Sequence, residues 1–312
     1  MIILIFLISY FYTFKYLDNN INNEEFIRMM LAYNYPNSEY KKTNTNIIFN
    51  ITKYITQIDL KNPFTMVKNN YVFKDNSNND SDNIINEEQA INQSEYINDP
   101  YPEKEIKDPL VYLYNTHQLE EYQKTGTESY NITPNVMMTS YILREKLENK
   151  GITTIVEENN VNEILRINNW NYASSYKVTK MLMEDAKEKN PTLKYFIDLH
   201  RDSVSKKIST TSINGKSYAK ILFIVGLENP NYQKNLDFTN KLQILFEQKY
   251  PGLSRGIYKK EGSNVNGVYN QDFNEKTILI EVGAIENTIE EVYNTIEAIV
   301  DVLSTQIGEE NE

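Results

Sequence analysis

The chain has 312 residues, enough for one large domain with additional segments. Its 32 basic and 43 acidic residues give a net charge of −11. This charge argues against a nucleic-acid partner and against general adsorption to an anionic membrane surface, since both need basic patches. The chain contains no cysteine, so any metal must be held by His, Asp or Glu, a donor set that suits zinc or another divalent cation.

An apolar run opens the chain at residues 2–14, and Lys15 and then polar sequence follow it. The run is shorter than the ~20 residues that a spanning helix needs, but Lys15 could extend the span by reaching the interface. No small-residue cleavage site follows, so we interpret residues 1–17 as an uncleaved membrane anchor. The alternative is a buried N-terminal helix.

The sequence of residues 18–107 predicts little regular secondary structure. A weak helical pattern covers 24–35, and the segments 47–51 and 54–60 resemble short strands. Residues 74–106 are rich in Asn and acidic residues and offer too little apolar surface to order themselves. We therefore interpret this last part as a linker.

From residue 108 onward, strand and helix patterns alternate, and we expect one catalytic domain over residues 108–312. Strands are expected at 109–114, 152–156, 193–199, 208–213, 216–225 and 277–282. Helices are expected at 133–151, 174–189, 231–249 and 288–304. Asn214 and Gly215 predict an antiparallel hairpin turn. This alternation predicts an α/β fold with a mixed, mostly parallel twisted sheet and helices on both faces.

The chain has only two histidines, and each follows a predicted strand. His117 comes after the strand at 109–114, and His200 comes directly after the strand at 193–199. Glu281 follows the apolar run of a third strand. Because ligands bind at the carboxyl ends of strands in open α/β sheets, we expect these side chains to meet at one edge.

A hydrolytic zinc site takes three protein ligands from His and Glu or Asp. We expect His117, His200 and Glu120, which lies three residues after His117, to be these ligands. The alternatives for the third ligand are Glu121, Glu128 and Asp202. Glu281 is expected to act as the general base, which takes a proton from water and returns it to the leaving nitrogen.

Each of these residues also has a structural interpretation, because a lone histidine is more often a hydrogen-bonded structural residue than a ligand. Asp198 should share a face of its strand with His200, so it is expected to orient a ligand or to cap a neighbouring loop. Arg201 and Arg255 could clamp a substrate carboxylate, or could lie solvated on the surface.

The ordered motifs resemble those of the stage II sporulation protein P family, a branch related to zinc-dependent N-acetylmuramoyl-L-alanine amidases. Residues 111–122 look like the family's motif, in which Asn-Thr-His or His-Thr-His precedes a glutamate and a tyrosine. Further matches stand in the same order at 130–133, 198–202, 214–215, 221–226, 269–272 and 279–284. Residues 58–63 also look like the family's membrane-proximal segment.

The chain departs from the family pattern near the expected carboxylate ligand. Glu121 replaces the usual small residue after Glu120, and Asn115 stands where some members have a histidine. A second Thr-Glu-Ser-Tyr sequence at 127–130 keeps Glu128 open as the ligand.

The resemblance implies an amidase-like fold and a membrane-anchored enzyme whose catalytic domain faces the cell wall, outside the cytoplasm. It implies cleavage of the amide bond between N-acetylmuramic acid and L-alanine in peptidoglycan, with cross-link endopeptidase activity, in septal thinning and engulfment during endospore formation. It further implies zinc as the cofactor, His117, His200 and Glu281 as site residues, and the stage II sporulation D and M proteins as partners.

Two other functions fit the same residues. A zinc peptidase of the carboxypeptidase type would act on free peptides, and a non-catalytic scaffold would bind the cell wall with His117 and His200 in structural roles. Product analysis and zinc content distinguish the three hypotheses.

Overall fold

A computed structural model of the chain describes residues 94–102, 106–125, 127, 132–263 and 265–310. The predicted membrane anchor at 1–17 and the helix and strand patterns expected between 24 and 60 lie outside the described residues. Among the helices that the structure describes, none is both long and apolar enough to span a bilayer.

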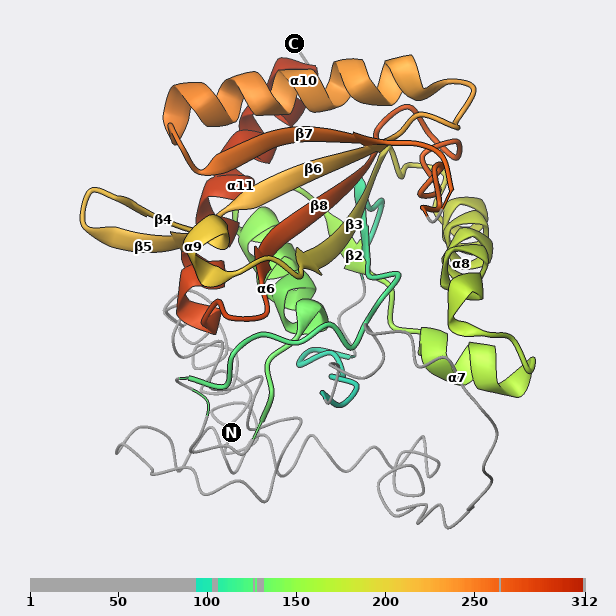
Figure 1. The fold of residues 1–312 in the computed structure, drawn as a ribbon. Helices are drawn as coiled ribbons and strands as arrows, with labels where there is room; N and C mark the ends of the chain where they lie inside the picture. The colour runs from blue at the N-terminus through green and yellow to red at the C-terminus, as the bar shows by residue number, and fades with distance from the viewer. Residues whose placement is uncertain (1–93, 103–105, 126, 128–131, 264, 311–312) are drawn as a thin grey trace, which may run out of the picture. The chain divides into compact units, whose positions relative to one another are not determined.

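A six-stranded sheet with the order β2-β1-β3-β8-β6-β7 lies at the centre of the described fold (Figure 1). Its strands are β1 (Val111–Tyr114), β2 (Thr154–Val156), β3 (Tyr195–Asp202), β6 (Ile221–Gly226), β7 (Ser254–Lys260) and β8 (Thr277–Ala284). The pairings β1–β2, β1–β3, β3–β8 and β6–β7 are parallel, and β6–β8 is antiparallel. The predicted mixed, mostly parallel sheet is therefore confirmed. Since β1, β3 and β8 are neighbours and run the same way, their carboxyl ends share one edge.

Helices cover both faces of this sheet, as predicted. They are α6 (Val136–Asn149), α7 (Val161–Ile167), α8 (Ser175–Lys189), α10 (Tyr232–Lys249) and α11 (Ile289–Glu309), with the single turns η2 (Tyr172–Ser174) and α9 (Lys206–Ser209). Along β3, Ile197 and Leu199 pack with residues of α6, α10 and α11, whereas Phe196 packs with α8. Because side chains alternate along a strand, Asp198 and His200 face the side that α8 covers.

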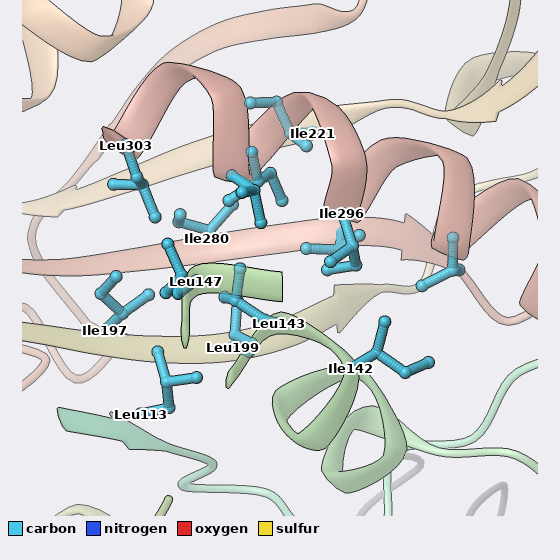
Figure 2. Packing of buried hydrophobic residues seen from close by; sticks show 14 of the residues in the cluster. Leu113, Ile142, Leu143, Leu147, Ile197, Leu199, Ile221, Ile280, Ile296 and Leu303 are labelled. Carbon is cyan, nitrogen blue, oxygen red and sulfur yellow. The ribbon is translucent and has the colours of Figure 1, made fainter. Parts of the chain in front are cut away.

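The largest apolar cluster fills the space between the sheet and the helices α6, α10 and α11. Figure 2 shows its side chains interleaved, among them Leu113 of β1, Leu143 of α6, Ile280 of β8 and Ile296 of α11. Burying each such side chain stabilises the fold by roughly 1.5–3 kcal/mol. This layer therefore fixes the strands whose ends carry the predicted site residues.

The start of α6 differs from the expected start at Thr133. Asn135 is the N-cap, and its side-chain oxygen accepts hydrogen bonds from the backbone amides of Met137 and Met138 at 3.1 and 3.4 Å. The carbonyl of Pro134 instead accepts from the amide of Tyr122. Asparagine caps a helix about as well as threonine, so local sequence did not decide between the two positions.

The predicted hairpin is present as β4 (Thr210–Ile213) and β5 (Lys216–Ala219), which form a separate two-stranded sheet that projects from the sheet edge in Figure 1. Asn214 and Gly215 have φ angles of 52° and 78°, the left-handed values that this turn requires. The single strand expected at 216–225 is divided into β5 and β6, because β5 pairs with β4 while β6 joins the central sheet.

The helix α7 and the strand β7 were not predicted, and neither were the single turns η2 and α9. The helix α7 is short, and its N-cap Asn160 accepts from the amide of Glu163. The strand β7 is polar and contains Gly256, and it lies at the edge of the sheet. An edge strand faces solvent on one side, so it lacks the apolar run that marks a central strand.

Residues 94–101, which we interpreted as the end of a linker, pack against α6. Ile97 is 1% exposed. Asp99 forms a buried ion pair with Arg144 of α6 through both carboxylate oxygens. The Asn135 side chain donates to the carbonyl of Glu95 at 2.9 Å. The linker prediction rested on the polar composition of residues 74–106 as a whole, which gave no sign of these few anchoring residues. The linker interpretation is therefore wrong for residues 94–101.

Candidate active site

The structure brings His117, His200 and Glu281 to the same edge of the sheet. His200 on β3 and Glu281 on β8 are register partners of two parallel strands, so their side chains leave the sheet on the same face. His117 follows β1, the other neighbour of β3. The centroids of the two imidazole rings are 5.2 Å apart, and the rings are nearly perpendicular at 82°.

Glu120 lies against His200. A turn in which the Glu120 amide donates to the carbonyl of His117 brings it back toward the sheet edge. Its Oε2 is 3.3 Å from Nδ1 of His200 and accepts a hydrogen bond from the Arg201 amide at 2.9 Å. Glu120 is 6% exposed, so this contact is shielded from water.

The alternatives for the third ligand are placed differently. Asp202 forms an ion pair with Arg255, in which the carboxylate Oδ2 is 2.5 Å from Nη2. The backbone carbonyl of Glu121 accepts from Nε of Arg201. Glu128 lies outside the described residues. The geometry therefore favours Glu120, and both arginines expected as possible substrate clamps are engaged within the protein.

Asp198 connects His200 to the loop that carries His117. It is fully buried and accepts hydrogen bonds from the amide and the hydroxyl of Thr116 at 2.9 and 2.6 Å. Its Oδ1 is also 3.1 Å from Nε2 of His200, an ion-pair distance without the angle of a hydrogen bond. Asp198 thus both orients a histidine and caps a loop, the two roles that its position predicts.

The two histidines differ in protonation. Burial and the neighbouring positive charge of His200 together lower the pKa of His117 to about 4. Burial also opposes the charged form of His200, but Asp198 and Glu120 outweigh it and hold the His200 pKa well above its usual range. The pKa of Glu120 is lowered, because the attraction of His200 exceeds the opposing effect of burial.

Glu281 has the opposite shift. Its pKa is raised to about 7, mainly by burial, and the negative charges of Glu120 and Asp202 contribute in the same direction against the attraction of His200. Its Oε2 is buried and has no hydrogen-bond partner among the described residues. A carboxyl group with this pKa can exchange a proton near neutral pH.

Three tyrosines line the site, and sequence reasoning missed them. The ring of Tyr172 stacks on His117 at 4.6 Å, and the ring of Tyr176 meets His117 edge-on at 5.7 Å. Tyr269 meets Tyr176 edge-on at 5.5 Å. The chain has 24 tyrosines, so composition offered no signal for these three; Tyr269 begins the matched segment 269–272, whose role the motif did not reveal.

The residues fit a zinc ion by type and by the placement of their ring nitrogens. Nδ1 of His117 is buried without a hydrogen-bond partner among the described residues, and Nδ1 of His200 faces the Glu120 carboxylate at 3.3 Å. Two imidazoles and a carboxylate are a usual donor set for catalytic zinc. Within the described part of the chain, however, no three acidic or histidine side chains already enclose a position for an ion. Binding would therefore require at least one of these side chains to rotate.

Comparisons with known proteins agree on a family. The family model described as "Stage II sporulation protein P" matches residues 24–304. The stage II sporulation protein P of Bacillus subtilis (strain 168) is 35% identical over 229 residues, which cover 71% of this chain and 57% of the relative. The chain therefore spans little more than half the length of that relative.

A search of solved structures found Cwp6 from Clostridium difficile, at 13% identity and a TM-score of 0.39. The match covers 63% of this chain and 29% of the other. A similarity of this size carries no conclusion about the fold or the function.

Proposed function

The chain belongs to the stage II sporulation protein P family, and from this premise we propose that it is a zinc-dependent peptidoglycan hydrolase that acts in engulfment during endospore formation. The proposed reaction is cleavage of the amide bond between N-acetylmuramic acid and L-alanine. The observation that carries the proposal is the buried contact between Glu120 and His200, with His117 and Glu281 beside it at one sheet edge.

His117, Glu120 and His200 would hold the zinc. His117 is neutral at physiological pH, the form in which imidazole binds a metal, and Glu120 is a carboxylate. His200, whose pKa is raised, would release its proton when the metal binds. Zinc, when bound, would supply Lewis acidity to the scissile carbonyl and to water. Asp198 restrains the His200 ring from its far side, as carboxylates behind ligand histidines do in metal sites.

Glu281 would move the proton. Its unpaired Oε2 and its pKa of about 7 suit a carboxylate that takes a proton from the attacking water. The same carboxyl then delivers the proton to the nitrogen of the leaving peptide as the amide bond breaks. Glu120 cannot share this role, because its contact with His200 keeps it ionised.

Digestion of purified peptidoglycan tests the proposal. The chain should release free stem peptides and leave the glycan strands intact, and chelation or His200→Ala should stop the release. Glu281→Gln should also abolish release but retain zinc, whereas the matched control Glu184→Gln, on the exposed face of α8, should leave the rate unchanged.

The outcomes separate the competing functions. Unchanged release in His200→Ala or after chelation would end the zinc proposal. Products cut within cross-links would indicate an endopeptidase, and cleavage of free peptides alone would indicate a carboxypeptidase-type enzyme. A folded, metal-free and inactive chain that still binds the wall would indicate a scaffold.

We further propose that residues 1–17 anchor the chain in the cell membrane with the catalytic domain facing the wall, and that the stage II sporulation D and M proteins are its partners. The apolar run at 2–14 supports the anchor. Deleting residues 1–17 should abolish function in sporulating cells while the purified chain keeps its hydrolytic activity. Loss of activity in solution as well would contradict a role confined to anchoring.

A further inference from the structure

Tyr172, Tyr176 and Tyr269 form an aromatic wall beside the site, and Tyr176 lies at its centre. Its ring lies nearly parallel to that of His200, at 6.5 Å and 13°, and meets His117 and Tyr269 edge-on. The residue is partly exposed. Its side chain therefore lies beside both histidines and is reachable from solvent.

The hydroxyl of Tyr176 has no hydrogen-bond partner in the described part of the chain, whereas several other tyrosine hydroxyls near the core have one. Tyr122, for example, donates to the carbonyl of Val282 at 2.9 Å, and Tyr112 donates to Glu157 at 2.5 Å. Asp198, Glu281 and Glu120 are close enough for their charges to act on the Tyr176 phenol. Tyr176 thus brings an unpaired donor to the two histidines of the site.

A backbone turn outside the sheet holds Tyr176 in this position. The side-chain amide of Asn270 donates to the carbonyl of Tyr176 at 2.9 Å and to the hydroxyl of Thr179 at 3.0 Å. Thr179 in turn lies 3.2 Å from the hydroxyl of Thr116, which donates to Asp198. Asn270 therefore links the first turn of α8 to the group that orients His200.

The turn itself has an unusual backbone. Tyr269 and Asn270 have φ angles of 54° and 55°, and two consecutive residues other than glycine rarely adopt this left-handed conformation. Strained residues of this kind persist where the surrounding structure over-determines them, and they concentrate at functional sites.

The end of β6 holds the strained turn in place. The amide of Gln271 bridges this end, since its Nε2 donates to the carbonyl of Ile224 and its Oε1 accepts from the Gly226 amide. A Cβ at Gly226 would lie 2.3 Å from the carbonyl oxygen of Gly267, so the turn packs directly on the strand.

We propose that Tyr176 is a catalytic residue whose hydroxyl donates a hydrogen bond to the carbonyl oxygen of the scissile amide, and that Asn270 is the residue that positions it. This inference rests on the proposed amidase function. A phenol is a donor at neutral pH, and a donor aimed at the oxygen that gains negative charge lowers the barrier of amide cleavage. Phenylalanine at position 176 would retain the aromatic ring but lose the donor.

Tyr176→Phe tests the donor. We expect kcat for release of stem peptides to fall about 100- to 1,000-fold, because removal of one such donor commonly costs this much. The melting temperature and the zinc content should stay unchanged, because the ring still packs against both histidines. The matched control is Tyr250→Phe. Tyr250 follows α10, and its hydroxyl donates a hydrogen bond to Asp301 of α11, so its loss should leave the wild-type kcat unchanged. A kcat within twofold of wild type in Tyr176→Phe would overturn the inference.

Substrate affinity provides a measurement that does not require turnover. Binding of N-acetylmuramoyl-L-alanyl-D-isoglutamine to the purified chain, followed by calorimetry, should weaken about two- to fivefold in Tyr176→Phe, the size of one modest hydrogen bond. Unchanged affinity would overturn the inference even if the wild-type chain proves inactive on peptidoglycan. An inactive wild-type chain with weakened binding in Tyr176→Phe would instead remove the amidase proposal and keep the contact.

Asn270→Gly tests the positioning role, because glycine accepts the left-handed backbone but lacks the amide. We expect kcat to fall in this variant, and we expect the double variant with Tyr176→Phe to be no slower than Tyr176→Phe alone. Two losses that act through one hydroxyl are not additive. Fully additive losses would show that Asn270 acts on something other than Tyr176.

Discussion

At the scale of single residues, the site is a group of charged side chains whose electrostatic interactions are strengthened by burial. Glu120 and Asp198 contact His200 from two sides, while His117 stays neutral next to it. Glu281 receives no such partner, so the same burial that strengthens the other contacts raises its pKa. Glu281, whose ionised form its surroundings stabilise least, is thus the carboxyl group suited to exchange protons near neutral pH.

This arrangement predicts a stability effect of Glu281 that depends on pH. Its folded pKa of about 7 exceeds the ordinary value of 4.5, so the folded state binds more protons between these values. Stability should therefore fall as pH rises from about 4.5 to 7, with the full cost present above pH 7. In metal-free protein, Glu281→Gln should be more stable than wild type by about 1–3 kcal/mol at pH 8 and by little at pH 5.

Urea denaturation of both proteins at the two pH values measures this difference. The matched control Glu184→Gln, exposed on α8, should change stability equally at pH 5 and pH 8. If Glu281→Gln shows no gain at pH 8, the carboxylate is better solvated than its surroundings indicate.

At the scale of elements, the site depends on which strands are neighbours. The parallel pairings of β1 with β3 and of β3 with β8 place three strand ends together, although the strands are far apart in the chain. The segment 94–101 supports the same edge from outside the sheet. The hydroxyl of Ser94 donates to the carbonyl of Leu119, the residue before Glu120.

The packing of residues 94–101 predicts a measurable contribution to the stability of the catalytic domain. Ile97→Ala should lower the free energy of unfolding by about 2–4 kcal/mol, because it removes buried methyl groups and leaves a cavity. The neighbouring control Glu95→Ala should cost under about 0.5 kcal/mol, since its side chain is exposed. Chemical denaturation of both variants checks this. A cost for Ile97→Ala as small as that of the control would mean that the segment is a linker after all.

At the scale of the whole molecule, the proposed zinc site joins the ends of two neighbouring strands that are far apart in the sequence. His117 and Glu120 come from the loop between β1 and α6, and His200 comes from the end of β3. An ion bound by all three would be present only in the folded chain, so it should stabilise the fold as a whole.

Zinc binding should therefore raise the melting temperature. At a free zinc concentration of 100 times its dissociation constant, the expected stabilisation is about 2.7 kcal/mol. Thermal unfolding of the metal-free chain with and without zinc measures it, with His200→Ala and magnesium as controls that should show no shift. An equal zinc shift in His200→Ala would place the ion elsewhere.

The sequence was sufficient to predict the parts that depend on local pattern and on residue type. Apolar runs and the amphipathic helix at 288–304 predicted the alternating α/β fold, and the scarcity of histidine directed attention to His117 and His200. Local pattern failed where tertiary contacts decide the structure. It missed the edge strand β7, the division of 216–225 at Lys220, and the anchoring of Ile97 against α6.

Only the tertiary structure decided which carboxylate meets His200, because that contact joins residues 80 positions apart. Glu120 and Asp202 are equivalent acids in the sequence, and the fold separates them by giving Asp202 to Arg255. The aromatic wall is likewise a product of folding, since Tyr172 and Tyr176 contact His117 and Tyr269 packs on Tyr176, although the three come from separate elements and loops. A local pattern reports which face of an element is buried, but the partners on that face come from distant parts of the chain.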